Sequence, residues 1–384
     1  MRRSELFSGL VGMALLPAAA CAQPWLTREG ELWVRTFHET RTAKPRLRIN
    51  AHGPVTLEGN VSANFEFTVK VSVRARTREQ ARAILEKAAL RTERQTDWLV
   101  LTTPGGNAQT RVEMRAPRLQ EAVVSTSDGA VEAYGIDGPL TVDTGADQVR
   151  VDRIHGDCTL STGGGEIHVG TVDGFLHCST GAGAITAKSV RGEVVLRTNG
   201  GDIDALSVNG TGGARAETGG GMVHLGFING PVTAINGGGP IIVDLAAGIV
   251  TTRNMAGPVR VGAAAGIRCD SANGGIQLGR ITGPMRVSTS MGSIVANLLG
   301  SKLGESYLAT GNGDITVMIP SNVGVTISAE NQLADSIRRI LSDFREIQPR
   351  LRGMRLEAEG PVNGGGPLLQ ISASSGTIFL KRTQ

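Results

Sequence analysis

The sequence predicts an all-β protein: a two-walled parallel β-solenoid of about 18 residues per coil, with a small mixed α/β cap at its N-terminal end and an amphipathic helix near its C-terminal end. Three observations lead to this prediction. Glycine accounts for 53 of 384 residues, roughly twice its ordinary usage. Glycine, threonine and apolar residues recur at a constant interval. Each interval contains two short runs in which apolar and polar residues alternate, as in half-buried strands.

Residues 1–22 have the features of an export signal. Arg2 and Arg3 precede a short apolar run over residues 6–16, and Ala20-Cys21-Ala22 offers a small-residue cleavage site. We therefore expect an exported protein located in the periplasm, at the outer-membrane surface or outside the cell. A second interpretation stays open, because Cys21 after three alanines also resembles a bacterial lipoprotein signal and would then carry a lipid anchor.

Residues 23–118 lack the repeat and form the predicted N-terminal cap. A strand-like run covers residues 65–73, and residues 77–92 have helical apolar spacing with Thr77 in the N-cap position. A solenoid needs its ends covered, because an open end exposes strand edges and core side chains.

The repeat occupies residues 119–330. From Asp137 onward, rows of 18 residues align glycine at 138, 156, 174, 192 and 210, and threonine at 144, 162, 180 and 198. Apolar residues align in the same way. The two clearest apolar columns are Leu140, Cys158, Leu176 and Val194, and Val149, Ile167, Ile185 and Ile203. A fixed period of this size is typical of stacked repeat architectures.

Each row is too short for a helix and two strands, so we expect one coil with two strands and two glycine-rich corners. Corners such as Thr162-Gly163-Gly164-Gly165 suggest backbone with positive φ. Identical columns would stack about 4.8 Å apart, and about eleven coils would give a rod of roughly 50 Å. The outward positions carry small polar residues: Thr141, Thr159, Ser161, Ser179 and Thr186.

Residues 331–352 are predicted to form an amphipathic helix and a linker, and residues 353–384 the strands that complete the solenoid. The helix prediction rests on the apolar positions Leu333, Ile337, Ile340, Leu341, Phe344 and Ile347. The helix over residues 331–347 has two possible roles: a cover for the end of the core, or a docking site for an envelope protein.

The segments STGGGEIHV (161–169), TNGGDI (198–203) and TGNGDITV (310–317) resemble the repeat units of the bacterial putative-adhesin family. The resemblance extends from about Glu31 to the C-terminus. It implies an exported β-solenoid with a surface or adhesive role, and it brings no catalytic residues.

The sequence offers no convincing metal or cofactor site. A calcium-binding roll needs acids in successive turns, but the equivalent column contains only Glu166, Asp202 and Asp314 among uncharged residues. Glu166 and His168 share an outward face and could supply half a metal site. No phosphate-binding glycine motif occurs, and an aromatic content of 3% argues against a nucleic-acid partner.

The best candidates for catalysis are Asp202 and Asp204, two residues apart and outward, together with Arg197. Some polysaccharide-degrading enzymes use pairs of carboxylates on such walls, but the short turns leave no loops to enclose a substrate. We therefore expect no enzymatic activity and no catalytic residues.

The cysteines that follow the signal are Cys158, Cys178 and Cys269. Cys158 and Cys178 fall in different columns of adjacent coils, about 8 Å apart, which is beyond disulfide reach. The resulting hypothesis is a non-enzymatic envelope or surface protein that adheres through its flat walls to a surface or envelope polymer. The alternative is an envelope scaffold or stress-linked protein that docks a partner through the helix predicted over residues 331–347.

Overall fold

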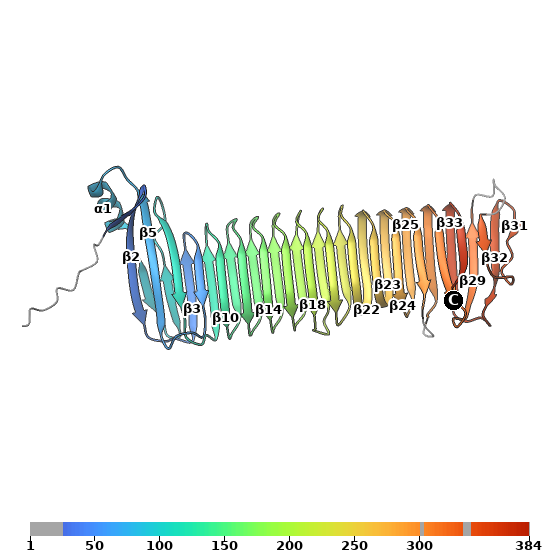
Figure 1. Cartoon of the computed structure of the whole chain (residues 1–384), viewed down its shortest axis with the longest axis horizontal. Coiled ribbons are helices and arrows are strands. Elements are labelled where there is room, and N and C mark those ends of the chain that lie inside the picture. Colours follow the sequence, from blue (N-terminus) through green and yellow to red (C-terminus); the bar gives the residue numbers. More distant parts are fainter. Residues whose placement is uncertain (1–25, 300–302, 333–338, 384) are drawn as a thin grey trace, which may run out of the picture.

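The computed structural model describes residues 26–299, 303–332 and 339–383. The chain is nearly all β, with 62% strand, 3% helix and about 11 solenoid turns of about 18 residues each. The turns stack into a long rod, with the N-terminal cap at one end and the C-terminal strands at the other (Figure 1). The predicted parallel β-solenoid is confirmed. The predicted export signal at 1–22 lies outside the described residues and stays a prediction.

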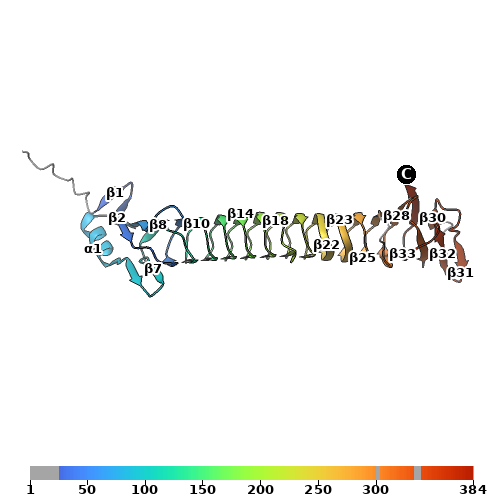
Figure 2. The ribbon, with the colours of Figure 1, turned by 90° about the horizontal axis from the view of Figure 1, so that it is seen from below.

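Two parallel sheets form the long sides of the rod, and the side view separates them (Figure 2). The sheet that we call the first wall contains β9 (Glu121–Thr126), β11 (Leu140–Thr144), β13 (Cys158–Thr162), β15 (Leu176–Thr180), β17 (Val194–Thr198), β19 (Ala214–Thr218), β21 (Val232–Asn236), β25 (Met285–Met291), β27 (Ser306–Asn312) and β33 (Leu368–Ser375). The second wall contains β10 (Val131–Ile136), β12 (Val149–Ile154), β14 (Ile167–Val172), β16 (Ile185–Val190), β18 (Ile203–Val208), β20 (Val223–Ile228), β24 (Ile276–Ile281), β26 (Ile294–Leu298), β28 (Ile315–Pro320) and β34 (Ile378–Thr383).

Two long strands run from the second wall around a corner into the first wall. They are β22 (Ile241–Ala256) and β23 (Val259–Asn273). Their first halves pair with each other and with β20 and β24, and their second halves pair with each other and with β21 and β25. The ladder register shifts between Ala246 and Ile249, where the strands turn the corner.

The apolar columns read from the sequence are the ladder partners of the structure. Leu140 pairs with Cys158, which pairs with Leu176. Ile167 pairs with Ile185, and Ile185 with Ile203, and all three are fully buried. Burying each of these side chains contributes roughly 1.5–3 kcal/mol. The two walls therefore enclose one continuous apolar core.

The threonine column closes the corner that follows each first-wall strand. Thr180 Oγ1 donates to the carbonyl of Gly165, in the preceding coil, at 2.8 Å and accepts from the amide of Gly183 at 3.2 Å. Thr162 and Thr198 make the same kind of bond one coil before and one coil after. Each buried hydroxyl thus satisfies backbone groups that the sharp corner leaves outside the ladders.

Glycine is needed at this corner because of close packing between coils and not, as the sequence suggested, because of positive φ. Gly163, Gly164 and Gly165 are not among the residues with positive φ. A Cβ at Gly163 would lie only 2.0 Å from the carbonyl oxygen of Gly145 in the preceding coil, whereas one at Gly164 would meet nothing within 4 Å. Close stacking of successive coils therefore requires the missing side chain.

The N-terminal cap extends both walls and adds antiparallel strands and one helix. Its elements are β1 (Thr27–Glu29), β2 (Leu32–Arg41), β3 (Arg46–Ala51), β4 (Val55–Glu58), β5 (Phe65–Arg74), α1 (Arg78–Lys87), β6 (Arg91–Arg94), β7 (Trp98–Thr102) and β8 (Gln109–Arg115). Thr77 caps α1 as predicted, accepting from the amide of Gln80 at 3.3 Å. The helix ends at Lys87, earlier than the predicted Thr92. No helix within the described ranges is long and apolar enough to cross a membrane.

At the other end the chain leaves the simple coil order. After β28 it forms β29 (Val325–Asn331), β30 (Ile340–Ser342), β31 (Arg350–Arg352) and β32 (Arg355–Val362). It then returns as β33 and β34, which pair with β27 and β28. β29 pairs with β33 on one side and antiparallel with β32 on the other. The extreme C-terminus thus supplies a coil that is inserted between β27/β28 and the terminal strands β29 and β30.

The predicted amphipathic helix over 331–347 is wrong for the residues that the structure describes. Residues 333–338 lie outside them, but Asn331 ends β29, and Ile340 belongs to β30, where it pairs with Ile378. Ile340, Phe344 and Ile347 are each only 2% exposed. Their spacing looks helical, but a short strand followed by a turn places all three on the end of the core. Tertiary packing overrides the local periodicity here.

Candidate functional site

The outer faces of the two walls are the surfaces that the fold presents for contact. Along each strand, buried residues alternate with half-buried or exposed ones, as in Cys158–Thr162 on the first wall. The outward residues repeat once per coil and are small and polar over much of the first wall, where Thr141 pairs with Thr159 and Asp143 with Ser161. Later coils present Val195, Arg197, Arg215 and Glu217 instead. The flat face suits contact with an extended partner.

The structure separates the three residues considered for catalysis. Arg197 lies on β17 of the first wall and forms an ion pair with Glu217 at 3.2 Å. Asp204 lies on β18 of the second wall, where its Oδ1 is 2.9 Å from His224 Nδ1. Asp202 accepts from the amide of Met222 at 2.7 Å and so has a structural role. The arginine therefore lies on the opposite wall from the two carboxylates.

A histidine lies between two carboxylates on the outer face of the second wall, in a cluster that no short sequence motif reveals. His224 Nδ1 lies 2.9 Å from Asp204, and its Nε2 lies 3.1 Å from Asp244. Partial burial favours the neutral imidazole, but the hydrogen bonds to Asp244 and Asp204 outweigh it and raise the pKa of His224. Both ring nitrogens can donate only when the ring is charged, so the cluster favours the imidazolium.

Glu166 and His168 do meet, as the shared face predicted, with 3.1 Å between Oε2 and Nε2. In the described ranges no group of three or more histidine, cysteine, aspartate or glutamate side chains is arranged to hold a metal ion. In the column compared with calcium-binding rolls, Asp202 and Asp314 accept hydrogen bonds from backbone amides of the next coil. These carboxylates join coils to one another.

The three cysteines of the described chain are buried and unpaired. Cys158 faces Leu176 across the ladder and Cys178 faces Leu160, so the register keeps the two sulfurs in different columns. Burial raises the pKa of Cys158 to about 12 and that of Cys269 to about 11. These thiols behave as small core side chains.

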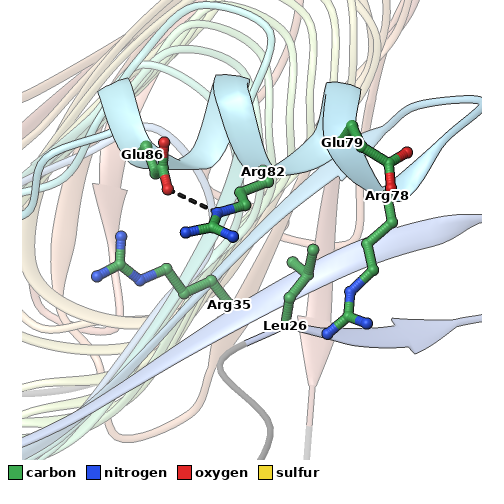
Figure 3. A pocket seen from close by; sticks show the side chains of 6 residues that line it. All are labelled: Leu26, Arg35, Arg78, Glu79, Arg82 and Glu86. Atoms are coloured by element: carbon green, nitrogen blue, oxygen red, sulfur yellow. Dashed lines mark hydrogen bonds and ion pairs between the residues drawn. The ribbon is translucent and has the colours of Figure 1, made fainter.

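A hollow of about 740 Å³ lies in the cap between α1 and β2 (Figure 3). It is lined by Leu26, Arg35, Arg78, Glu79, Arg82 and Glu86. Arg82 pairs with Glu86 at 2.8 Å, and Arg35 donates to the carbonyl of Leu85 at 3.3 Å. The second of these contacts attaches the helix to the strand, which gives Arg35 a structural role.

A second hollow, of about 320 Å³, lies on the first wall near the C-terminal end of the rod. Arg268, Arg286, Glu305, Tyr307 and Gln370 are among its lining residues. These arginines could not be recognised as a cluster from the sequence, because they belong to no short motif and lie on different strands. The ladder register brings them together.

No protein-family model matches the chain, and no curated protein matches it. Among solved structures it is similar to a putative cell adhesion protein from Clostridium sporogenes, with 10% identity, a TM-score of 0.19, and coverage of 91% of this chain and 100% of that one. It is also similar to a putative adhesin from Bacteroides fragilis, with 11% identity, a TM-score of 0.25 and coverage of 72% and 97%. A putative lipid binding protein from Parabacteroides distasonis shows 12% identity, a TM-score of 0.25 and coverage of 71% and 92%. Similarity at this level assigns no ligand and no activity to the chain.

Proposed function

We propose that this protein is a non-enzymatic envelope or surface rod that adheres to a surface or polymer through its flat walls. The observation that carries the proposal is the flat outer face of the first wall, where Thr141, Thr159, Ser161 and Ser179 face outward on three successive coils and larger or charged side chains follow on the next coils. Many weak contacts along such a face add up when the partner is extended and repetitive.

Binding to isolated cell-envelope fractions tests the proposal. Immobilised protein is incubated with cell-wall polymer, outer-membrane vesicles and soluble envelope extract, and the bound material is measured. We expect retention of a polymer or surface fraction by the full-length rod and weaker retention by a form with fewer central coils. A protein that retains none of these fractions would contradict the adhesive function.

The absence of catalysis is part of the proposal and needs its own experiment. Activity is screened on a panel of polysaccharides, with Asp202→Asn and Asp204→Asn as variants. We expect no cleavage by any form. Cleavage by the wild type that either variant abolishes would replace adhesion with polysaccharide degradation as the function.

We also propose that residues 1–22 direct export, and that a lipid anchor at Cys21 is the alternative to cleavage after Ala22. Mass spectrometry of the mature N-terminus distinguishes the two. A chain beginning at Gln23 supports cleavage, a lipid-modified Cys21 supports the anchor, and an intact Met1 in the cytoplasm contradicts export.

A further inference from the structure

Among the stacked coils an excess of positive charge is concentrated in one zone, although the N-terminal cap (residues 26–118) carries a larger excess, with 17 basic and 10 acidic residues. Between Leu245 and Leu299 the sequence contains five arginines and one acidic residue, Asp270, so this zone alone carries a formal charge of +4, the value for the whole chain. The arginines are Arg253, Arg260, Arg268, Arg280 and Arg286. All five are exposed, and none forms an ion pair or a side-chain hydrogen bond with a residue of the described ranges.

Elsewhere on the first wall arginines have partners. Arg197 and Arg215 both pair with Glu217. In the basic zone, Arg268 and Arg286 are direct ladder neighbours on β23 and β25. Their backbones are thus about 4.8 Å apart, and like charges directly opposite each other destabilise a sheet. Glu305 lines the same hollow as these two arginines, but among the described residues no ion pair joins it to Arg268 or Arg286, so both guanidinium groups are available to an external anion.

The column continues with residues of a different kind. Arg286 pairs with Tyr307 on β27, and Tyr307 pairs with Gln370 on β33. The hollow of about 320 Å³ follows this column and also contains Glu305. Two guanidinium groups, a half-exposed phenol ring, an amide and a carboxylate therefore face one groove along the axis of the rod.

We propose that this column binds an acidic polysaccharide lying along the rod. The inference rests on the proposed adhesive function and names the chemistry of its ligand. Guanidinium groups bind carboxylate or sulfate through paired hydrogen bonds. The ring of Tyr307 offers an apolar face for a sugar ring, and Gln370 and Glu305 can bond hydroxyl groups. Glu305 would repel a partner that is only anionic, so the ligand must combine charge with hydroxyls.

The experiment measures binding of the full chain to polygalacturonate and to dextran sulfate, with neutral dextran and polyglutamate for comparison. The test variant is the double substitution Arg268→Gln and Arg286→Gln. The matched control is Arg260→Gln and Arg280→Gln, which removes the same charge from the same coils but on the second wall. Melting curves establish that both variants fold.

We expect the first-wall variant to lose about tenfold or more in affinity for one of the acidic polysaccharides, since each lost charge-assisted contact weakens binding severalfold. The second-wall control should change affinity by less than about threefold, because its charges act only at a distance and are screened at physiological salt. A Tyr307→Leu variant should also weaken polysaccharide binding while leaving polyglutamate unaffected.

Three outcomes overturn the inference. The first is the absence of binding to both acidic polysaccharides, and the second is an equal loss of affinity in the two double variants. The third is equally tight binding of polyglutamate, which would show that binding depends on charge alone. The adhesive function fails separately. If the protein retains an envelope fraction but does not bind acidic polysaccharides, the adhesive function stands and only the proposed ligand class is wrong.

Discussion

His224 Nδ1 lies 2.9 Å from Asp204 Oδ1 on the neighbouring strand of the second wall, and its Nε2 is held by Asp244. This contact raises the pKa of His224 above its ordinary value. A raised pKa means that the folded protein binds the proton more tightly than the unfolded chain does. Protonated His224 therefore stabilises the folded protein fully at a pH below the pKa of the unfolded chain, about 6.5. This stabilisation disappears as the pH rises through the pKa of His224 in the folded protein.

We predict that His224→Gln lowers the free energy of unfolding more at pH 5 than at pH 9. The difference should be roughly 0.2–1 kcal/mol, because the cluster is partly exposed and solvent screens it. Urea denaturation of both proteins at the two pH values measures it. Substituting His168, which contacts the single carboxylate of Glu166, provides the control. A His224 effect that is equal at both pH values would show that the cluster acts through packing alone.

The inward and outward assignment of β16 is tested by a pair of adjacent residues. Ile185 is fully buried between Ile167 and Ile203, while Thr186 is only half-buried on the outer face. Ile185→Asp would bury an unpaired charge and should cost several kcal/mol, at least about 3.

Thr186→Asp should lower the free energy of unfolding by less than about 1 kcal/mol, mostly because the new carboxylate would be repelled by its ladder neighbour Asp204. Thermal melting compares the two variants with the wild type. Similar losses in both would mean that the side chains of β16 do not alternate between core and solvent as described.

The corner glycines supply another matched pair. Gly163→Ala would place a methyl group 2.0 Å from the carbonyl oxygen of Gly145, so the coils must separate locally. We expect a loss of about 1–3 kcal/mol, as for other overpacked sites. Gly164→Ala meets nothing within 4 Å and should be neutral or stabilising by about 0.4–1 kcal/mol. Equal stability of the two variants would disprove the close-approach explanation.

Sequence periodicity was sufficient to predict the solenoid because each apolar residue is repeated one coil later. Val149, Ile167, Ile185 and Ile203 form one column in the sequence and one ladder in the structure. A local misreading of one row is corrected by its neighbours, since a one-residue slip would turn a whole face outward.

The same reasoning failed where the repeat stops. Ile340, Phe344 and Ile347 are spaced as on a helix, but they cover the end of the core from a strand and a turn. Periodicity within one segment cannot reveal a partner such as Ile378, which lies far along the chain. The second hollow could not be predicted for the same reason, since its lining residues Arg268 and Tyr307 share a column only through their common ladder partner Arg286.

Burial predicts the reactivity of the cysteines. With the pKa of Cys158 raised to about 12 and Cys178 fully buried, the thiolate needed for reaction is scarce in the folded protein. A thiol reagent at pH 8 should label none of Cys158, Cys178 and Cys269 within minutes, and all three once the protein is unfolded in guanidinium. Rapid labelling under native conditions would show that the coils open locally.

Two substitutions of one buried threonine test whether its hydroxyl or its methyl group stabilises the corner. Thr180 is 5% exposed and bonds both the carbonyl of Gly165 and the amide of Gly183. Thr180→Val keeps the shape of the side chain but leaves these two backbone groups without their hydrogen-bond partner, which should lower the free energy of unfolding by about 1–3 kcal/mol. Thr180→Ser keeps the hydroxyl and loses only the methyl group, so its cost should be near 1 kcal/mol, about that of one buried carbon. Denaturant titration ranks the variants, and a valine variant more stable than the serine variant would mean that packing, and not the hydrogen bonds, holds the corner.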